Sequence, residues 1–168
     1  MITLITGTPG AGKTLRAMFH LLEHKKRAEA NNLPFRCVGN VDGADPEYMG
    51  PMEHDWFEYP EHTLVVIDEC QTTFRPSRPH AAMPKIITEL EVHRHKGIDL
   101  ILVTQHPKLM NHHVRRLVGK HEHITRKNNF GMVTINSMSR SFDVDDHHEI
   151  RDSDTEVWKH PKALFDTY

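Results

Sequence analysis

The most informative stretch of the sequence is Gly7-Thr8-Pro9-Gly10-Ala11-Gly12-Lys13-Thr14, which directly follows the apolar run Met1-Ile2-Thr3-Leu4-Ile5-Thr6. We expect a short buried strand to end at Gly7 and a helix to begin near Gly12 and continue over residues 15–30. Glycine adopts backbone conformations that other residues avoid, so the pattern predicts a loop whose amides surround a phosphate group. We call residues 7–14 the P-loop.

In such a loop, successive amide groups and the positive end of the following helix hold the β-phosphate of a nucleotide. Lys13 is expected to reach the β- and γ-phosphates, and the Thr14 hydroxyl to take one ligand position on Mg²⁺. The alternative is an ordinary glycine-rich turn between a strand and a helix. The predicted nucleotide-binding residues are Gly7, Thr8, Pro9, Gly10, Ala11, Gly12, Lys13, Thr14 and Leu15.

Two adjacent carboxylates, Asp68 and Glu69, follow a second apolar run at residues 63–67. The run predicts a strand buried on both faces of a parallel sheet. Buried acids are costly without a partner, and a strand that ends at the ligand edge supplies one. Asp68 is therefore predicted to order the Mg²⁺ ligands near Thr14, and Glu69 to polarise a water molecule facing the γ-phosphate. The alternative is a solvated loop that begins with two surface acids.

A further strand is predicted at residues 98–105, and the polar residue Gln105 stands at its tip. If this strand lies beside the P-loop strand, the Gln105 amide can contact both the γ-phosphate and the attacking water. Gln105 would then sense the phosphate. Alternatively, its amide only caps the turn at His106-Pro107.

Composition predicts one compact α/β domain, because hydrophobic residues make up 38% and charged residues 26% of the 168 residues. The net charge of −2 argues against wrapping nucleic acid by charge alone. Cys37 and Cys70 are expected to be reduced core residues. The sequence begins without a secretory signal pattern, and no apolar run approaches the roughly 18 residues needed to cross a bilayer.

The remaining segments give weaker expectations. We expect a strand at residues 35–40, a long surface excursion at 42–60, helices at 83–96 and 108–120, and a hairpin with its turn at 128–131. Trp56 and Phe57 are expected to anchor the excursion, with base stacking or partner binding as the alternative. The tail from Trp158 onward is expected to dock.

Histidine and charge clusters are expected to be structural. Pairs such as His121 and His123 lack the spacing of a known metal site, which favours surface or core histidines. A basic stretch at 112–127 and an acidic one at 143–156 are taken as solvated faces. Pairing of the two between neighbouring subunits is the alternative.

The combination resembles the Zot family, the zonula occludens toxin-like proteins that include assembly and export ATPases of filamentous phages. The resemblance covers nearly the whole chain. It rests on residues 7–14, Val66-Ile67-Asp68-Glu69-Cys70-Gln71, Arg94-His95-Lys96-Gly97-Ile98-Asp99 leading into Thr104-Gln105, His160-Pro161-Lys162 and Phe165-Asp166-Thr167-Tyr168. The block from Arg94 to Gln105 is more specific than the P-loop, which many families share.

The resemblance implies an ATP-driven motor with ATP and Mg²⁺ as cofactors, acting in phage extrusion at the cytoplasmic face of the bacterial inner membrane. It also implies that a membrane-spanning segment and a periplasmic region follow this domain. Residues 1–168 are therefore expected to be a single ATPase domain, truncated before those regions and soluble. A homo-oligomeric ring is expected, and the cargo stays open among single-stranded DNA, coat protein and another assembly factor.

Together these points predict an additional-strand (ASCE) P-loop NTPase with an α/β fold. Its mainly parallel sheet is flanked by helices and ends in an antiparallel hairpin, with the Ile98 strand between the Met1 and Leu64 strands. Lys13 would neutralise the γ-phosphate, Glu69 would orient water, and Gln105 would sense the phosphate. An arginine from a neighbouring subunit would complete the site. The candidates for that arginine are Arg75, Arg78, Arg115 and Arg116.

Two other functions share the P-loop and stay open at this point. A nucleotide or small-molecule kinase would need an acceptor pocket and an arginine-rich lid, and would not need Glu69 together with Gln105. A nucleotide-gated scaffold would bind ATP with little turnover and would recruit partners.

Overall fold

The computed structural model describes residues 1–78, 82–126, 132–161, 164 and 167 of the chain. These residues form a sheet with strand order β3-β2-β4-β5-β1-β6-β7-β8. Strands β1 to β6 all run parallel to one another. β7 is antiparallel to β6, and β8 is antiparallel to β7. The strands are β1 (Ile2–Gly7), β2 (Arg36–Gly39), β3 (Gly50–Pro51), β4 (Thr63–Ile67), β5 (Asp99–Thr104), β6 (Lys120–Arg126), β7 (Met132–Met138) and β8 (Asp154–Lys159).

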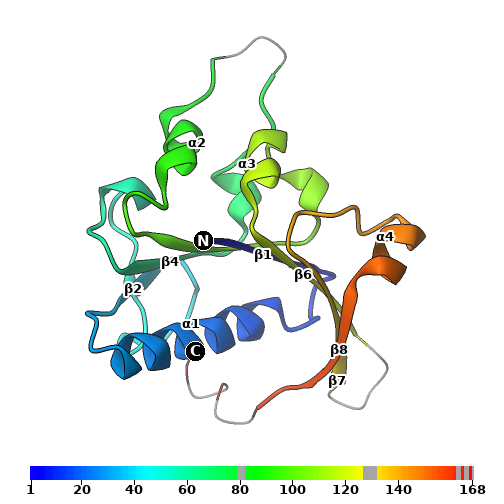
Figure 1. The fold of residues 1–168 in the computed structure, drawn as a ribbon, viewed down its shortest axis with the longest axis horizontal. Helices are drawn as coiled ribbons and strands as arrows, with labels where there is room; N and C mark the ends of the chain where they lie inside the picture. Colours follow the sequence, from blue (N-terminus) through cyan, green and yellow to red (C-terminus); the bar gives the residue numbers. More distant parts are fainter. Residues whose placement is uncertain (79–81, 127–131, 162–163, 165–166, 168) are drawn as a thin grey trace.

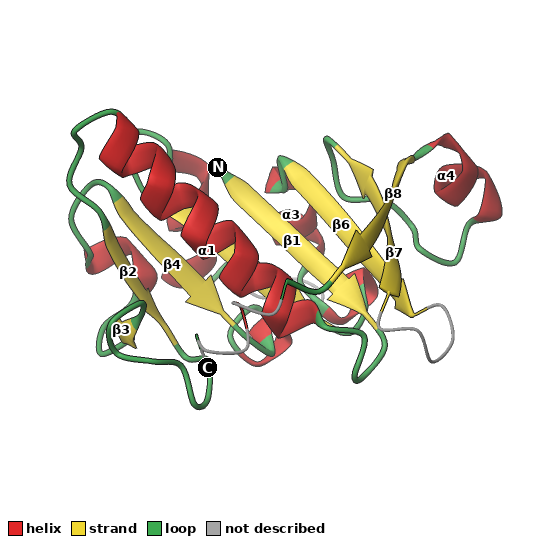
Figure 2. Cartoon of the chain, turned by 90° about the horizontal axis from the view of Figure 1, so that it is seen from below, coloured by secondary structure: helices red, strands yellow, loops and turns green. Residues whose placement is uncertain are grey.

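Helices cover both faces of the sheet (Figure 1). The long helix α1 (Lys13–Ala30) lies on one face, while α2 (Lys85–Thr88) and α3 (His112–Leu117) lie on the other. The short helix α4 (His147–Asp152) stands at the far edge beside β8, as Figure 2 shows. Short 3₁₀ turns occupy Trp56–Glu58, Cys70–Thr72, Glu89–Val92 and Pro107–Leu109.

The central strands are buried on both faces because each face packs against its own apolar cluster. Ile5 of β1 and Val103 of β5 belong to the cluster beneath α1. Leu4 and Leu102, which are neighbours in the paired register of these strands, belong to the cluster beneath α2 and α3. Such two-sided burial explains the continuous apolar runs of the sequence. In the order of the strands, β5 lies between β1 and β4, as the sequence predicted.

Several peripheral elements differ from the sequence-based expectation. The predicted helix at 83–96 is only α2 followed by a 3₁₀ turn, and the predicted helix at 108–120 is a 3₁₀ turn followed by α3. The surface excursion contributes β3 as an edge strand, while α4 and β8 were not predicted at all. These elements are short, so tertiary contacts rather than their own periodicity determine them.

Other peripheral expectations agree with the structure. Trp56 is fully buried and its indole donates a hydrogen bond to the Ile86 carbonyl, so its ring anchors the excursion and is not free to stack on a base. β6 and β7 form the predicted antiparallel pair, and the proposed turn at 128–131 lies outside the described residues. Cys37 and Cys70 are buried and unpaired, and burial raises the pKa of the Cys37 thiol to about 12.

Candidate functional site

The P-loop connects the end of β1 to the start of α1, and two of its glycines are required by geometry. A Cβ atom at Gly7 would lie 2.5 Å from the main-chain oxygen of Ile124 in β6. Gly12, the residue before α1, has φ 89°, and a Cβ there would lie 2.8 Å from Nε2 of His160. The loop is therefore enclosed by the backbone of β6 and by the residue that follows β8.

The amino terminus of α1 is arranged as an anion-binding site. Gly12 has no side chain to cap the first amides of α1, and the first turn contains no acidic residue. Lys13 is largely buried, and its Nζ donates to the Thr8 carbonyl at 3.2 Å. Uncapped helix amides and an adjacent ammonium group are the groups that bind a nucleotide phosphate.

The decisive contact joins the P-loop helix to the end of β4. The Thr14 hydroxyl donates to Oδ2 of Asp68 at 3.0 Å, and Oδ1 of Asp68 accepts from the Glu69 amide at 2.8 Å. Asn40, just after β2, holds the main chain of Asp68 through hydrogen bonds of 2.6 and 3.0 Å. A hydroxyl and a carboxylate are oxygen ligands of the kind that Mg²⁺ prefers, so Thr14 and Asp68 fit the predicted metal position.

Glu69 is held in a conformation that non-glycine residues rarely adopt, with φ 47° and ψ 44°. Its carboxylate accepts a hydrogen bond from Nε2 of Gln71, and Oε1 of Gln71 accepts one from the Thr104 hydroxyl at 2.7 Å. Thr104 is the last residue of β5 and is fully buried. Left-handed residues persist where surrounding contacts hold them, commonly at functional sites. The chain Glu69–Gln71–Thr104 thus connects β4 to β5 at the P-loop edge.

Gln105 stands at the predicted place, next to the P-loop, but its contact there is made by the main chain. The Gly7 amide donates to the Gln105 carbonyl at 3.2 Å, and the Gln105 side chain is exposed. Among the described residues, no partner holds the Gln105 amide, whereas Gln71 is hydrogen-bonded at both ends. Gln71 is not among the site residues predicted from the sequence, because it lies in a turn rather than at a strand tip.

The four candidate arginines fall into two groups. Arg75 and Arg78 are exposed in the segment after the Cys70–Thr72 turn. Buried Asn111 ties this segment to α3, because its side chain donates to the Arg75 carbonyl and to the Ser77 hydroxyl. Arg115 and Arg116 lie on α3 and line a cavity that contains no residue of the P-loop.

Comparison with known proteins shows the family. A family model described as Zonular occludens toxin (Zot) matches residues 45–168. The chain belongs to the Zot family. The family and fold predicted from the sequence are thereby confirmed.

Two relatives within reach of sequence comparison agree with this assignment. The chain is 35% identical, over its full length, to ORF301 of Pseudomonas phage Pf3, which is named for a role in assembly, and it spans 57% of that relative's length. The crystal structure of the N-terminal domain of zonular occludens toxin from Neisseria meningitidis has 30% identity and a TM-score of 0.83, covering 99% of this chain and 97% of that one.

More distant structures share the fold alone. The genome packaging NTPase B204 from Sulfolobus turreted icosahedral virus 2, in complex with AMPPCP, has 16% identity and a TM-score of 0.55 over 95% of this chain and 97% of its own. This Zot-family chain therefore has a P-loop fold of the additional-strand type, with β5 as the inserted strand. Among the described residues, no helix has the length and apolar character that would let it span a membrane.

A buried ion pair joins α1, the helix that follows the P-loop, to strand β6 of this Zot domain. Nε and Nη2 of Arg16 donate to the two carboxylate oxygens of Glu122 at 2.8 and 3.0 Å, and His20 also contacts Glu122 at 2.8 Å. Burial alone would raise the pKa of Glu122, but hydrogen bonds from His20 and Arg16 outweigh it and hold that pKa well below its ordinary value. Sequence analysis missed this pair because its members lie far apart in the chain.

The histidines of β6 form a second polar group, on the face of the sheet opposite α1. His121 and His123 lie on a strand, where residues two apart share a face, and both contact the Thr6 hydroxyl, at 2.8 and 2.9 Å. Nδ1 of His121 accepts from the Phe142 amide, so Nε2 carries the proton of the neutral ring and donates a hydrogen bond to the Thr6 hydroxyl. Burial, and to a lesser extent His123, lowers the pKa of His121 to about 3. His121 is therefore a neutral structural residue, as the sequence analysis favoured.

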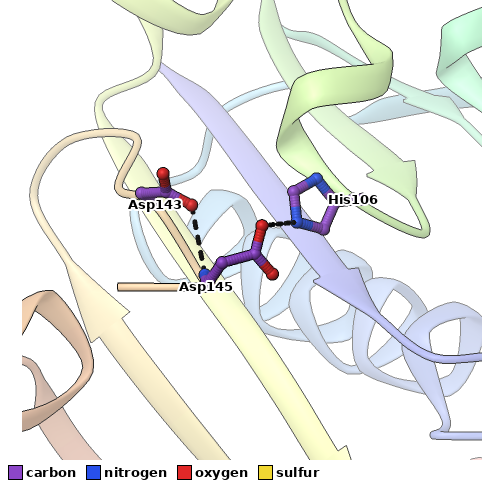
Figure 3. A group of neighbouring side chains, drawn as sticks. All are labelled: His106, Asp143 and Asp145. Carbon is purple, nitrogen blue, oxygen red and sulfur yellow. Dashed lines mark hydrogen bonds and ion pairs between the residues drawn. The ribbon is translucent and has the colours of Figure 1, made fainter. Parts of the chain in front are cut away.

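His106, Asp143 and Asp145 bring ligand-type atoms together nearby (Figure 3). Nδ1 of His106 accepts from the Lys108 amide, and its Nε2 contacts Asp145 at 3.2 Å. The Lys108 ammonium lies 2.9 Å from Asp143 and 3.0 Å from Asp145. A lysine thus already holds the cation position between these carboxylates. These contacts pair part of the acidic stretch with Lys108 of the same chain.

Proposed function

We propose that this Zot-family chain binds and hydrolyses ATP, and that it is the motor domain of a protein acting in filamentous-phage assembly or export at the bacterial inner membrane. The observation that carries the proposal is the hydrogen bond between Thr14 and Asp68. It joins the P-loop helix to the acidic end of β4, so that phosphate-binding amides, a metal-ligand pair and Glu69 occupy one edge of the sheet.

The site residues have distinct roles in this proposal. The P-loop amides and Lys13 hold the phosphates, and Thr14 and Asp68 hold Mg²⁺, which when bound neutralises charge on the phosphate oxygens. Glu69 orients the attacking water and accepts its proton. Gln105 faces the same edge and senses the γ-phosphate. Similarity to a packaging NTPase crystallised with AMPPCP supports nucleotide binding at this place through the fold.

Assembly into a ring completes the proposed site. Arg75 and Arg78 are the better candidates for the arginine supplied by a neighbouring subunit, because both are exposed in a segment that leaves the carboxyl end of β4. Arg115 and Arg116 are the weaker candidates, because they lie on α3 and line a cavity that contains no residue of the P-loop. Single-stranded DNA and coat or assembly proteins are the proposed cargo classes, and a segment beyond residue 168 the proposed membrane anchor.

Replacing single site residues tests the proposal. Glu69→Gln is expected to keep ATP affinity within about twofold and to lower steady-state hydrolysis at least about a hundredfold, because the water loses its base. Lys13→Ala is expected to weaken ATP binding itself, by at least about tenfold, because a charged contact to phosphate is lost. Binding is measured by calorimetry and turnover by phosphate release.

The same assays separate the alternatives. A kinase would release little phosphate from ATP alone and would form ADP only with an added acceptor, to which the phosphoryl group is transferred. A scaffold would turn over ATP so slowly that Glu69→Gln changes nothing. Either result, or equal loss of binding in both variants, would contradict the motor proposal. Arg36→Gln, on the exposed start of β2, is the matched control.

A further inference from the structure

A cavity of about 520 Å³ lies between α3 and residues 140–149, away from the P-loop. Its basic lining residues are Lys108, His112, Arg115, Arg116 and Arg140. The volume falls in the range of cavities that enclose small organic ligands and exceeds what a single inorganic ion needs. Cationic side chains gathered around such a volume favour an anionic ligand of nucleotide size.

The charges of the cavity are only partly compensated. Two carboxylates also line it, and each already has a cation: Asp143 pairs with Lys108 at 2.9 Å, and Glu149 pairs with Arg140 at 2.8 Å. Arg115 and Arg116 have no carboxylate partner among the described residues. In addition, Nε of Arg115 is buried and lacks a hydrogen-bond partner within the described part of the chain. Arg115 and Arg116 therefore carry positive charge that no carboxylate of the described chain balances through an ion pair.

The wall opposite α3 is held in place before any ligand binds. Phe142 is buried, packs its ring on His121 with centroids 4.3 Å apart, and donates its amide to Nδ1 of that residue. Glu149 also accepts the amide of Asp143, which closes the turn across the base of α4. A fixed wall lowers the entropic cost of ordering a ligand against it.

Phosphate is the anion that suits these groups best. A guanidinium offers paired donors in a fork that matches phosphate oxygens, and two adjacent arginines can share one phosphate group. Carboxylates present the same fork geometry, but the two carboxylates that line the cavity, Asp143 and Glu149, are engaged by Lys108 and Arg140 rather than by the α3 arginines. The α3 arginines therefore stay available to a ligand from outside the chain.

We propose that this cavity is a second phosphate site, in which Arg115 and Arg116 bind the phosphate of a nucleotide unit that is either free or one link of a single nucleic-acid strand. The site is separate from the P-loop and does not depend on ATP hydrolysis. If the ligand is a strand, the domain holds it on the α2/α3 face while the P-loop edge holds ATP.

Two probes test the site while the P-loop is filled with AMPPNP and Mg²⁺. The first is a labelled oligothymidylate, followed by fluorescence anisotropy, and the second is AMP, followed by equilibrium dialysis. Arg115→Gln/Arg116→Gln is expected to weaken binding of the true ligand at least about tenfold, because two charged contacts are lost. For a strand, the slope of log affinity against log salt should also fall by about 0.7 for each phosphate contact removed.

Controls keep the test independent of folding and of the proposed function. Lys26→Gln/Arg36→Gln removes the same charge from exposed positions elsewhere and should leave binding of both probes unchanged. AMPPNP affinity and thermal unfolding should be equal in all variants. If the double variant unfolds, Arg116→Gln alone serves, because Arg116 is exposed and its replacement disturbs no packing.

The outcomes are distinct. If Arg115→Gln/Arg116→Gln loses binding of the oligothymidylate, the ligand is a nucleic-acid strand. If it loses binding of AMP, the ligand is a free nucleotide. Equal binding to wild type and variant overturns the proposal, as does failure of the wild type to bind either probe. Binding of an acidic peptide in place of both probes would likewise overturn it, in favour of a protein partner.

Discussion

Asp68 at the end of β4 and Glu122 within β6 are both acids in a mostly apolar sheet, but their surroundings differ. Asp68 is half-buried, and among the residues that the structure describes its carboxylate accepts hydrogen bonds only from the Thr14 hydroxyl and the Glu69 amide. Glu122 is 1% exposed and meets the cationic groups of Arg16 and Lys120 as well as His20. Asp68 retains capacity to bind something else, whereas the capacity of Glu122 is used within the protein.

This difference separates a binding edge from a structural connection. The groups proposed to serve a ligand, Thr14, Asp68 and Lys13, lie side by side with part of their hydrogen-bonding capacity left over. Groups that hold elements together are saturated by partners from distant parts of the chain, as in the bond from α1 to β6. The following predictions break or sharpen the comparison by changing one member of each kind.

Breaking the structural connection should have the largest effect. Arg16→Met leaves Glu122 buried without its bidentate partner, and the free energy of unfolding is expected to fall by about 3–5 kcal/mol, measured by urea denaturation. Adding Glu122→Leu removes the unpaired charge and should restore at least half of the loss. Arg36→Met, at an exposed site, should change stability by less than about 0.5 kcal/mol.

A fall of less than about 1 kcal/mol in Arg16→Met would contradict the comparison, since Lys120 and His20 would then suffice to compensate the Glu122 charge.

The ion pair of Arg16 and Glu122 also predicts that stability falls in acid. The pKa of Glu122 lies below its unfolded value, so its contribution to stability is present above about pH 4.5 and is lost as the pH falls toward the folded pKa.

The two regions also differ in how far sequence predicts them. The P-loop and residues 63–69 are contiguous motifs, so Lys13, Thr14, Asp68 and Glu69 could be placed at one edge from the parallel-sheet rule alone. Arg16 and Glu122 belong to no such motif, because their pairing depends on the register between α1 and β6. Gln71 was missed for a related reason, since its role depends on the left-handed turn at Glu69.

Orientation of Glu69 should have a smaller effect than the buried ion pair. Gln71→Leu removes the link between Glu69 and Thr104, and hydrolysis is expected to fall about tenfold, or about 1.4 kcal/mol, with ATP affinity within about twofold. Turnover and binding are measured as for Glu69→Gln. Equal loss of affinity and turnover would show that Gln71 supports the loop rather than Glu69.

A second variant distinguishes orientation from general support. Gln71→Glu places a like charge beside Glu69, which should raise the pKa of Glu69 and move the acid limb of the hydrolysis rate profile to higher pH. Thr104→Val leaves Gln71 in place but removes its outer partner, so its effect should have the same direction and be smaller. A rate profile that does not move in Gln71→Glu would argue against contact with the catalytic carboxylate.

The histidines of β6 give the smallest expected effect. They test whether the hydrogen-bonding groups of His121 are fully used within the protein. His121 is neutral chiefly because it is buried, and a proton on its Nδ1 would also face the N–H of Phe142, which donates to that atom. Its folded pKa of about 3 lies below the ordinary histidine pKa of 6.5, so acid favours the unfolded chain, which binds the proton first. Between pH 7 and pH 6 this group alone should lower the free energy of unfolding by about 0.7 kcal/mol.

His121→Gln should remove that part of the pH dependence, whatever it does to stability at pH 7. The measurement is the difference between urea titrations at the two pH values, with exposed His147→Asn as the control that keeps the wild-type slope. Other histidines contribute to the total slope, because burial also lowers the pKa of His123 and lowers that of His24 to about 4. An unchanged slope in His121→Gln would mean that His121 takes up its proton while folded. The polar group on β6 would then resemble the nucleotide edge, with capacity left for a ligand, rather than the saturated pair of Arg16 and Glu122.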